Sequence, residues 1–331
     1  MRRWLVTGAL FVALLIAALA GLVAFNVARQ FESPGPLASE MNLVIPAGAG
    51  LKTIARSLTE AGVIRDTLTF RLGVRYHDAA RALKAGEFSF PPMASMRQVM
   101  EILKRGETVV RRLTIPEGLT SREIVALVAS AEGLTGDPGP VPEEGSLLPE
   151  TYYFSREDER GALIQRMATA QQELLSELWA ARDPDLPLAS PEEALVLASI
   201  VEKETAVGSE RSLVASVFVN RLRRGMRLQS DPTVVYGLTQ GQGPLGRTLT
   251  RKDLNTPSAY NTYLIDGLPP GPIANAGRAA LQAVFNPAST GYLFFVADGS
   301  GGHAFAETLD EHNRNVAKWR KLQRRQTQGT Q

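Results

Sequence analysis

Residues 190–205 read SPEEALVLASIVEKET, and this stretch decides the fold of the larger part of the chain. Ser190 suits a helix N-cap, Pro191 suits the first helical position, and Glu193 completes the pattern of a helix start. Residues 194–201 are apolar on nearly every side of such a helix. Because a helix that is hydrophobic all round must be covered on all sides, we expect a central, buried helix here.

Glu204 lies near the end of this helix, one turn after Ile200 and Val201, in the middle of an apolar face. Glu202 points to roughly the opposite side, at about 100° per residue. Burial among hydrocarbon raises the pKa of a carboxyl group and keeps it protonated near neutrality. Such a group can donate a proton to a glycosidic oxygen. The same position also fits a structural carboxylate paired with Lys203 or a later arginine, and periodicity does not decide between the two.

The residues beyond this helix are rich in amides, hydroxyls and aromatic rings set among glycines. A second amphipathic helix is predicted over 210–223. Polar groups without net charge suit a neutral polysaccharide, whose hydroxyls need hydrogen bonds and whose ring faces need flat apolar surfaces. Taken singly these signals are weak, because Asn and Gly are common turn formers and Tyr more often packs than binds.

Composition sets further limits. A chain of 331 residues is long for one core, so two domains with appendages are expected. The net charge of +2 gives no strong field to attract nucleic acid. The sequence contains no cysteine, which excludes disulfides, thiolate nucleophiles and cysteine zinc sites. Its three histidines lack a metal-ligand spacing, so neither a metal nor a cofactor is expected.

The N-terminus predicts the compartment. After Arg2 and Arg3, residues 4–25 carry no charge and no proline, and the run stays weakly apolar to Ala28. At about 1.5 Å per residue this is enough to cross a hydrocarbon core of roughly 30 Å. Arginines at the short end favour a cytoplasmic N-terminus with the bulk of the chain outside. A cleaved signal peptide ending at the Ala18-Leu19-Ala20 site is the alternative, and the length of the run favours an uncut anchor.

Two similar segments follow a Pro- and Gly-containing linker. LVIPAG at 43–48 and LTIPEG at 113–118 each predict a short strand and a turn, followed by an amphipathic helix. Between them, 86–90 alternates as a strand and 96–104 predicts a short helix. Small strand-helix repeats of this kind resemble LysM domains, which hold glycan chains; a spacer that merely packs fits the same pattern.

Several motifs together resemble the MltG-type (YceG-like) endolytic murein transglycosylases. They are ASIVEKET at 198–205, SVFVNRL at 216–222 and LQSDPT at 228–233, continued by YNTY at 260–263, GLPPGPI at 267–273 and FVA at 295–297. The resemblance covers the anchor, the LysM-like part and the catalytic part. It implies an enzyme that cleaves MurNAc–GlcNAc bonds within nascent glycan strands, leaves a 1,6-anhydro-MurNAc end and so terminates strand elongation.

In that family the catalytic glutamate is the second of the Glu-Lys-Glu-Thr motif, which falls on Glu204. One carboxyl can serve twice, first as general acid to the leaving oxygen and then as general base to the sugar's own 6-hydroxyl. Because water is not the nucleophile, the second carboxylate of most glycosidases is not required. His303 would suit a base, but a lone histidine after two glycines is more often a loop residue. Other residues in matching motifs are expected to bind sugar or orient Glu204: Thr205, Glu210, Asn220, Gln229, Asp231, Tyr236, Tyr260, Asn261 and Thr262.

The resemblance and the sequence pattern together predict an α+β protein with a transmembrane helix, a small LysM-like module and a mixed α/β catalytic domain around a buried catalytic helix. The expected segments are 1–29 (cytoplasmic tip and anchor), 30–40 (linker), 41–131 (LysM-like peptidoglycan-binding module), 132–320 (catalytic domain) and 321–331 (polar tail). The expected location is the bacterial inner membrane, single-pass, with the catalytic domain periplasmic.

The expected partners are peptidoglycan strands, inner-membrane lipid and, from the resemblance, peptidoglycan synthases of the penicillin-binding type. Two other functions stay open. One is a hydrolytic muramidase, in which Asp231 or Glu210 would act as the base. The other is a non-catalytic peptidoglycan-binding scaffold.

Overall fold

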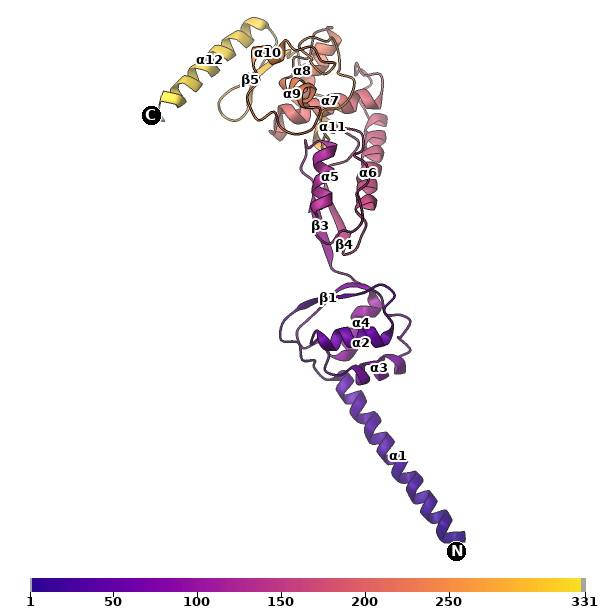
Figure 1. Ribbon diagram of the computed structural model, residues 1–331. Helices are drawn as coiled ribbons and strands as arrows, with labels where there is room; N and C mark the ends of the chain where they lie inside the picture. Colours follow the sequence, from indigo (N-terminus) through magenta and orange to yellow (C-terminus); the bar gives the residue numbers. More distant parts are fainter. Residues whose placement is uncertain (1, 329–331) are drawn as a thin grey trace. The chain divides into compact units, whose positions relative to one another are not determined.

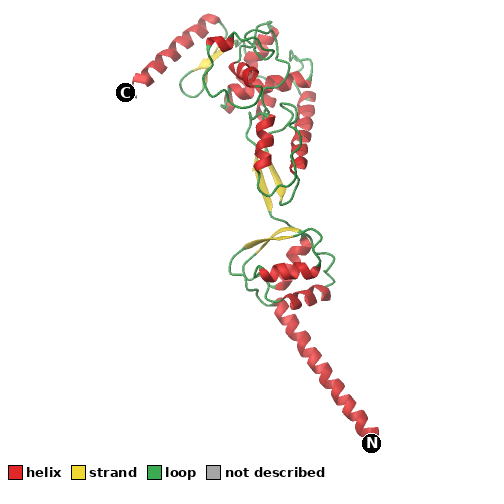
Figure 2. Ribbon diagram, in the orientation of Figure 1, coloured by secondary structure: helices red, strands yellow, loops and turns green. Residues whose placement is uncertain are grey.

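The computed structural model describes residues 2–328; Met1 of the expected cytoplasmic tip and residues 329–331 of the expected tail lie outside this range. Helices dominate, and the described strands form three two-stranded sheets (Figures 1 and 2). The elements in chain order are α1 (Arg2–Glu32), β1 (Met41–Ile45), α2 (Leu51–Glu60), α3 (Thr67–Tyr76), β2 (Gly86–Phe90), α4 (Met96–Arg105), β3 (Val110–Thr114), α5 (Ser121–Ser130), β4 (Thr151–Ser155), α6 (Arg160–Ala180), α7 (Pro191–Glu204), the 3-10 turn η1 (Gly208–Glu210), α8 (Arg211–Arg223), α9 (Asp231–Thr239), α10 (Arg251–Leu254), α11 (Arg278–Phe285), β5 (Phe294–Ala297), β6 (His303–Ala306) and α12 (Leu309–Gln328).

The chain divides into two compact units. Unit 1 comprises the residues up to Arg111 together with Tyr153–Glu157, and unit 2 comprises Arg112–Tyr152 and the residues from Asp158 onward. The mixed α+β class predicted from the sequence is confirmed at this level. The second strand-helix segment, β3 followed by α5, has most of its residues in unit 2.

The N-terminal helix α1 carries the apolar run, and Leu10–Glu32 is long and apolar enough to cross a membrane. Its described side chains before the last turn are almost all exposed, as expected of a helix whose partner is not protein. The last turn differs. Phe31 is buried in the core of unit 1, and so is Leu37, although both fall within the stretch 30–40 expected to be a linker.

In unit 1, α2 and α4 pack against the antiparallel strands β1 and β2, and α3 packs against α2 and α4. β1 pairs with β2 in a register that places Leu43 opposite Phe88. The predicted strand at 86–90 and the predicted helix near 96–104 are both confirmed. Helix α4 begins with a capping box, in which the Ser95 hydroxyl accepts from the Gln98 backbone and the Gln98 side chain accepts from the Ser95 backbone. The two elements share an apolar core that includes Phe88 and Met100.

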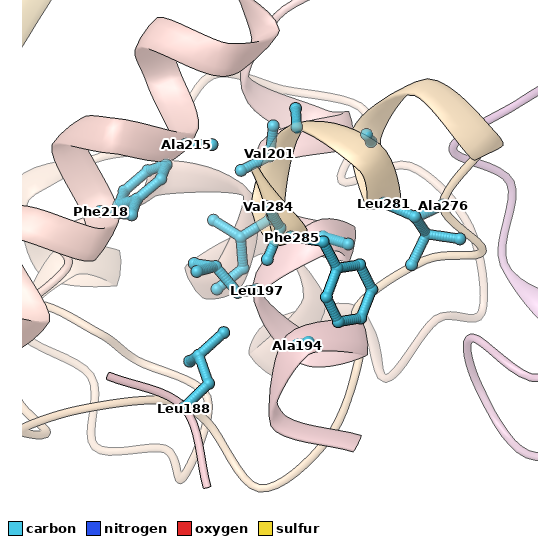
Figure 3. Close-up of a cluster of buried hydrophobic side chains, with 14 of the residues drawn as sticks. Leu188, Ala194, Leu197, Val201, Ala215, Phe218, Ala276, Leu281, Val284 and Phe285 are labelled. Carbon is cyan, nitrogen blue, oxygen red and sulfur yellow. The ribbon is translucent and has the colours of Figure 1, made fainter. Parts of the chain in front are cut away.

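Unit 2 is built around α7. The Ser190 hydroxyl accepts a hydrogen bond from the Glu193 backbone at 3.3 Å, and Pro191 occupies the first turn, so the predicted helix start is confirmed. Residues Val196 to Val201 are all buried, because α6, α8, α9 and α11 pack around the helix. Figure 3 shows the consequence: side chains of α7 lie against Phe218 of α8 and against α11 within one core cluster.

The C-terminal part completes unit 2. β5 and β6 form an antiparallel hairpin with Phe295 opposite Phe305, and α12 packs against both strands. The Phe295 ring lies edge-on to Phe218 of α8, with ring centroids 6.0 Å apart. The hairpin is thereby fixed against the helices that follow α7, and it supplies one wall of the site described below.

Candidate active site

Glu204 is the last residue of α7, at the point where the buried helix leaves the core. Its side chain borders a cavity of ≈ 360 Å³. Among the described residues none forms an ion pair with Glu204, so the pairing with Lys203 that the sequence left open is not observed in the structure. The cavity is lined by Glu204, Phe218, Arg221, Leu228, Gln229, Asp231, Tyr263, Phe294, Phe295, Leu309 and His312.

The direct partner of Glu204 is a hydroxyl group. Ser230 Oγ donates a hydrogen bond to Glu204 Oε1 at 2.5 Å. Ser230 is itself 1% exposed and is the N-cap of α9. Because an N-cap side chain commonly turns back to its own helix, the orientation of this hydroxyl toward Glu204 is a specific feature of the site.

Two polar loop residues hold Ser230 in place. Thr262 Oγ1 accepts from the Ser230 backbone at 2.9 Å, and the Thr262 carbonyl accepts from the Gln229 backbone at 3.1 Å. Asn261 donates to the carbonyls of Leu254 and Thr256 at 3.0 and 2.8 Å. Asn261 and Thr262 are both 0% exposed. In this structure they therefore shape the loop that presents Ser230, and their side chains do not line the cavity.

Burial raises the pKa of Glu204 to about 7, and the Asp231 charge acts in the same direction. The hydrogen bond from Ser230 opposes this rise, and so do the neighbouring His303 and Arg221. Desolvation is the largest of these effects, as expected for a carboxyl at the end of an apolar helix. Near neutral pH the group thus exists in both protonation states, which suits a residue that must donate and then accept a proton.

Arg221 of α8 forms hydrogen bonds to two segments that contribute to the walls of the cavity. Its guanidinium donates to the carbonyls of Leu293 and Leu228, both at 2.7 Å, and lies 3.5 Å from Gln229 Oε1. These acceptors belong to the segments before β5 and before α9. Burial lowers the pKa of Arg221 from its usual value. Gln229 has a positive φ of 51°, so this fork supports a strained residue beside Ser230.

Asp231 lies at the mouth of the cavity, as the first residue of α9. Its Oδ1 accepts a hydrogen bond from the Tyr263 hydroxyl at 2.7 Å. Burial raises the pKa of Tyr263 to a value above its usual range, and the hydrogen bond to Asp231 adds to the rise. The phenol therefore stays protonated and keeps donating to the carboxylate.

A second pocket of ≈ 350 Å³ shares Asp231 with the first and lies along α9. Tyr236 and Lys203 are among its lining residues. The Tyr236 ring lies 4.8 Å from the ring of Tyr260, and its hydroxyl donates to Glu144 Oε2 at 3.3 Å. Tyr236 therefore borders the pocket next to that of Glu204, separated from it by Asp231.

Glu210 is hydrogen-bonded to the β5–β6 hairpin through His303, which is the first residue of β6 and not the loop residue expected from the sequence. His303 contributes both its backbone N–H, at 2.9 Å from Glu210 Oε1, and its ring Nδ1, at 2.7 Å from Oε2. A side chain on Gly302 would have its Cβ 2.5 Å from Glu210 Oε1, so the glycine allows this close approach. His303 also lies close enough to Glu204 to act on the pKa of that carboxyl group.

Thr205 and Asn220 have structural contacts. Thr205 caps the end of α7, and its hydroxyl accepts from the Val207 backbone at 3.0 Å. Asn220 donates to the carbonyls of Thr290 and Tyr292 at 2.8 and 3.0 Å. Of the residues singled out from the sequence, only Glu204, Gln229 and Asp231 line the first cavity.

The side chains of Glu202 and Glu204 point in different directions, as the helical period predicts. Glu202 Oε2 accepts from the Gly277 backbone at 3.0 Å, at the N-terminus of α11. Burial raises the pKa of Glu202, and the hydrogen bond from the Gly277 backbone opposes this rise. Lys203, between them, donates to the Gly118 carbonyl at 3.1 Å and borders the second pocket.

Several residues that form the site could not be recognised as site residues from the sequence. Ser230 and Arg221 stand inside the motifs quoted above, yet Ser230 bonds to Glu204, 26 residues away, and Arg221 bonds to Leu293, 72 residues away, which no local pattern reveals. Tyr263 completes the YNTY motif, and nothing in the motif indicates its bond to Asp231. His312 of α12 borders the cavity with its ring stacked on Phe294, at 5.2 Å between centroids. Within residues 2–328, no group of three or more acidic, His or Cys side chains is arranged to hold a metal ion.

Comparison with known proteins assigns the class. The model of the YceG-like family matches residues 43–318. This span includes both strand-helix segments, α7 and the hairpin, so the chain belongs to the YceG-like family.

The chain is also similar to two bacterial proteins that are named endolytic murein transglycosylase. The chain is 31% identical over 315 residues to the endolytic murein transglycosylase of Bacillus subtilis (strain 168), and the match covers 84% of each protein. It is 30% identical over 323 residues to the endolytic murein transglycosylase of Streptococcus pneumoniae (strain D39), covering 83% of this chain and 57% of that protein. The chain thus spans little more than half the length of the pneumococcal relative.

Among solved structures, a putative yceG-like protein of Listeria monocytogenes is 31% identical. The similarity covers 84% of this chain and 99% of that one, with a TM-score of 0.49.

Proposed function

We propose that this protein is an endolytic murein transglycosylase that cleaves MurNAc–GlcNAc bonds in nascent glycan strands, with Glu204 as its single catalytic carboxyl. The observation that carries the proposal is the position of Glu204 at the end of a buried helix, bordering a cavity and with its pKa raised to about 7. Membership of the YceG-like family and relatives named endolytic murein transglycosylase support the same reaction.

In the first step, protonated Glu204 donates its proton to the glycosidic oxygen while the bond between that oxygen and C1 of MurNAc breaks. The desolvated carboxyl is suited to this task because it retains its proton near neutral pH. Ser230 remains hydrogen-bonded to Oε1, which leaves Oε2 to face the substrate.

In the second step, the Glu204 carboxylate takes the proton of the 6-hydroxyl as that oxygen bonds to C1. The product is a 1,6-anhydro-MurNAc end, and Glu204 is again protonated. No water enters the reaction, so no second carboxylate is needed to activate one. The hydrogen bond from Ser230 stabilises the carboxylate between the two steps.

We assign supporting roles to the residues around Glu204. Asp231 and Gln229, which line the cavity, would contact sugar hydroxyls. Tyr236, which lines the second pocket, would offer its ring to a neighbouring sugar, with the Tyr260 ring packed against it. Thr205, Asn220, Asn261 and Thr262 would act by orienting the loops, and Glu210 would act through His303.

The remaining segments receive roles by the same reasoning. Residues 1–29 would anchor the protein in the inner membrane with a cytoplasmic N-terminus, and 30–40 would lead out of it. Residues 41–131 would form a LysM-like module that holds a glycan strand, and 132–320 would form the periplasmic catalytic domain ahead of the tail at 321–331. Synthases of the penicillin-binding type would be partners during strand elongation.

The test compares two neighbouring glutamates. Glu204→Gln should abolish cleavage of isolated glycan strands while keeping the fold. Glu202→Gln is the matched control, because its side-chain oxygen can still accept from the Gly277 backbone and it lies away from the cavity. If Glu204→Gln cleaved strands as the wild-type protein does, Glu204 would not be the catalyst.

The same comparison separates the alternatives. A hydrolytic muramidase would lose activity on Asp231→Asn or Glu210→Gln as completely as on Glu204→Gln. A non-catalytic scaffold would bind strands and cleave none in any variant, including the wild type.

A further inference from the structure

Helix α3 of unit 1 has two apolar faces. Its inner face packs into the core through Phe70 and Val74, each 0% exposed. On the outer face Leu68, Leu72 and Tyr76 remain 59%, 42% and 86% exposed. With a spacing of four residues, these three side chains lie within about 80° of one another on the helix surface. The outer stripe therefore contributes nothing to the core, although it is apolar.

This stripe adjoins the membrane helix candidate. Phe31 in the last turn of α1 lies against α3, with its ring 6.4 Å from Phe70 and stacked on His77 at 5.7 Å. A Cβ on Gly73 would come within 2.3 Å of the Phe31 ring, so the glycine permits a very close crossing of the two helices. An ion pair of 2.6 Å between Glu32 and Arg97 fastens α1 to α4 as well. α1 thus enters unit 1 as a packed element.

An open, largely apolar cavity of ≈ 970 Å³ lies in the angle between α1 and α3. One wall consists of α1 side chains from Ile16 to Phe31, and the other includes Leu72 and Tyr76. His77, Glu32 and Arg97 supply its polar rim. A cavity with hydrocarbon walls and a charged rim matches an acyl chain below a phospholipid headgroup.

The charge around the stripe agrees with this occupant. At about 100° per residue, Arg71 and Arg75 flank the stripe on one side. Arg65 and Arg81 are exposed before and after the helix, so four arginines near the stripe outnumber the two acidic residues there, Asp66 and Asp78. Arginine beside an apolar face with an aromatic anchor is typical of helices that lie in a membrane interface, where cations meet anionic headgroups.

We infer that the outer face of α3 lies in the headgroup region of the same bilayer that α1 spans, with phospholipid filling the angle between the two helices. Unit 1 then rests on the membrane in a fixed orientation, held at α1 and at α3. The inference rests on α1 being a membrane anchor, as in the proposed function, and is independent of the reaction at Glu204.

Single labels can test this directly, because the chain contains no cysteine. Cysteine would replace Leu72 or Tyr76 in the full-length protein, which is then labelled with an environment-sensitive fluorophore. The protein is placed, one copy per disc, in nanodiscs of phosphatidylethanolamine and anionic phosphatidylglycerol. Quenching is measured with aqueous iodide and with a lipid-borne nitroxide, after circular dichroism has confirmed the fold.

Two control positions make the result decisive. Leu14 of α1 is 64% exposed in the protein alone and reports on the anchor. Val110 is an apolar residue of unit 1 that is 61% exposed. Its neighbour Val109 bonds to Glu87 of β2, and the β1–β2 pair lies on the side of unit 1 away from α1 (Figure 1).

We expect labels at Leu72 and Tyr76 to resemble the label at Leu14, quenched by the lipid nitroxide and shielded from iodide, while the label at Val110 shows the reverse. If Leu14 lies in lipid but Leu72 and Tyr76 behave as Val110 does, the inference is wrong and the anchor stands. Protection of Leu72 only on addition of glycan strands would also overturn it. If Leu14 is not in lipid, the anchor and the inference fail together, with no consequence for catalysis by Glu204.

Discussion

Ser230 Oγ donates to Glu204 Oε1 at 2.5 Å, so the N-cap of α9 meets the C-terminal residue of α7 at a single hydrogen bond. The contact links a buried carboxyl to a loop segment that Thr262 and Asn261 hold beside it. Burial and this bond act in opposite directions on the pKa of Glu204. The balance between them sets the pH range in which the residue can exchange its proton.

Replacing Ser230 by alanine should change activity and its pH dependence together. Loss of a hydrogen bond to a charged group costs about 1.5–3 kcal/mol, which corresponds to a rate lower by roughly 10- to 100-fold. Since the bond lowers the pKa of Glu204, its removal should move the alkaline limb of the activity profile to higher pH. The measurement is strand cleavage against pH. Ser176→Ala, an exposed serine on α6 that bonds to its own helix, is the control.

The wild-type activity should fall as the pH rises through about 7, the pKa of Glu204, because the acid step requires the protonated form. Activity that stays constant up to pH 9 would contradict Glu204 as the acid. The profile is measured at constant ionic strength, so that screening of the neighbouring Asp231 charge does not contribute to the change.

The same pKa predicts an effect on stability. A carboxyl whose pKa is raised on folding binds its proton more tightly in the folded state. Its contribution to stability is therefore fully present below the unfolded pKa of about 4.5 and is lost as the pH rises toward 7. Glu204→Gln avoids this loss, which amounts to about 1.4 kcal/mol for each pH unit that separates the folded and unfolded pKa. Thermal unfolding should show the variant more stable than the wild type at pH 8, with the difference vanishing near pH 4.

Glu202 should matter for stability more than for chemistry. Glu202→Ala removes the acceptor of the Gly277 N–H at the start of α11, which should lower the free energy of unfolding by about 1–2 kcal/mol. Activity per folded molecule should change little. Denaturant unfolding and cleavage assays on the same preparation check both statements, and a loss of activity with unchanged stability would count against this role.

Even a conservative replacement of Arg221 should lower both the stability and the activity of the protein. Lysine keeps the charge but cannot reach the carbonyls of Leu228 and Leu293 together, because it lacks the planar fork. Arg221→Lys should therefore reduce stability by about 1–3 kcal/mol and reduce cleavage as the wall of the cavity loosens. Arg224→Lys, at the exposed C-cap of the same helix, is the control and should be neutral in both assays.

Local sequence patterns predicted the parts of this fold that depend on local chemistry. The cap at Ser190 and the apolar run up to Val201 are sufficient to define α7, and the helical period separates Glu202 from Glu204. These features require no knowledge of distant residues, and each agrees with the structure.

Long-range contacts could not be predicted in the same way. A polar residue in a loop motif looks the same in sequence whether it contacts a ligand or supports the backbone. The motifs predict that Asn261 and Thr262 bind sugar or orient Glu204, and the structure shows both fully buried. Arg221 bonds to Leu293, 72 residues further along the chain, and only the tertiary fold brings these two residues together.

The central claim, that Glu204 closes a 1,6-anhydro ring without water, is tested most directly by mass spectrometry of the new ends on digested glycan strands. The account predicts anhydro-MurNAc ends, lighter by one water than reducing ends, for the wild type and for Glu202→Gln, and no new ends for Glu204→Gln. New reducing ends produced by the wild-type protein would contradict it.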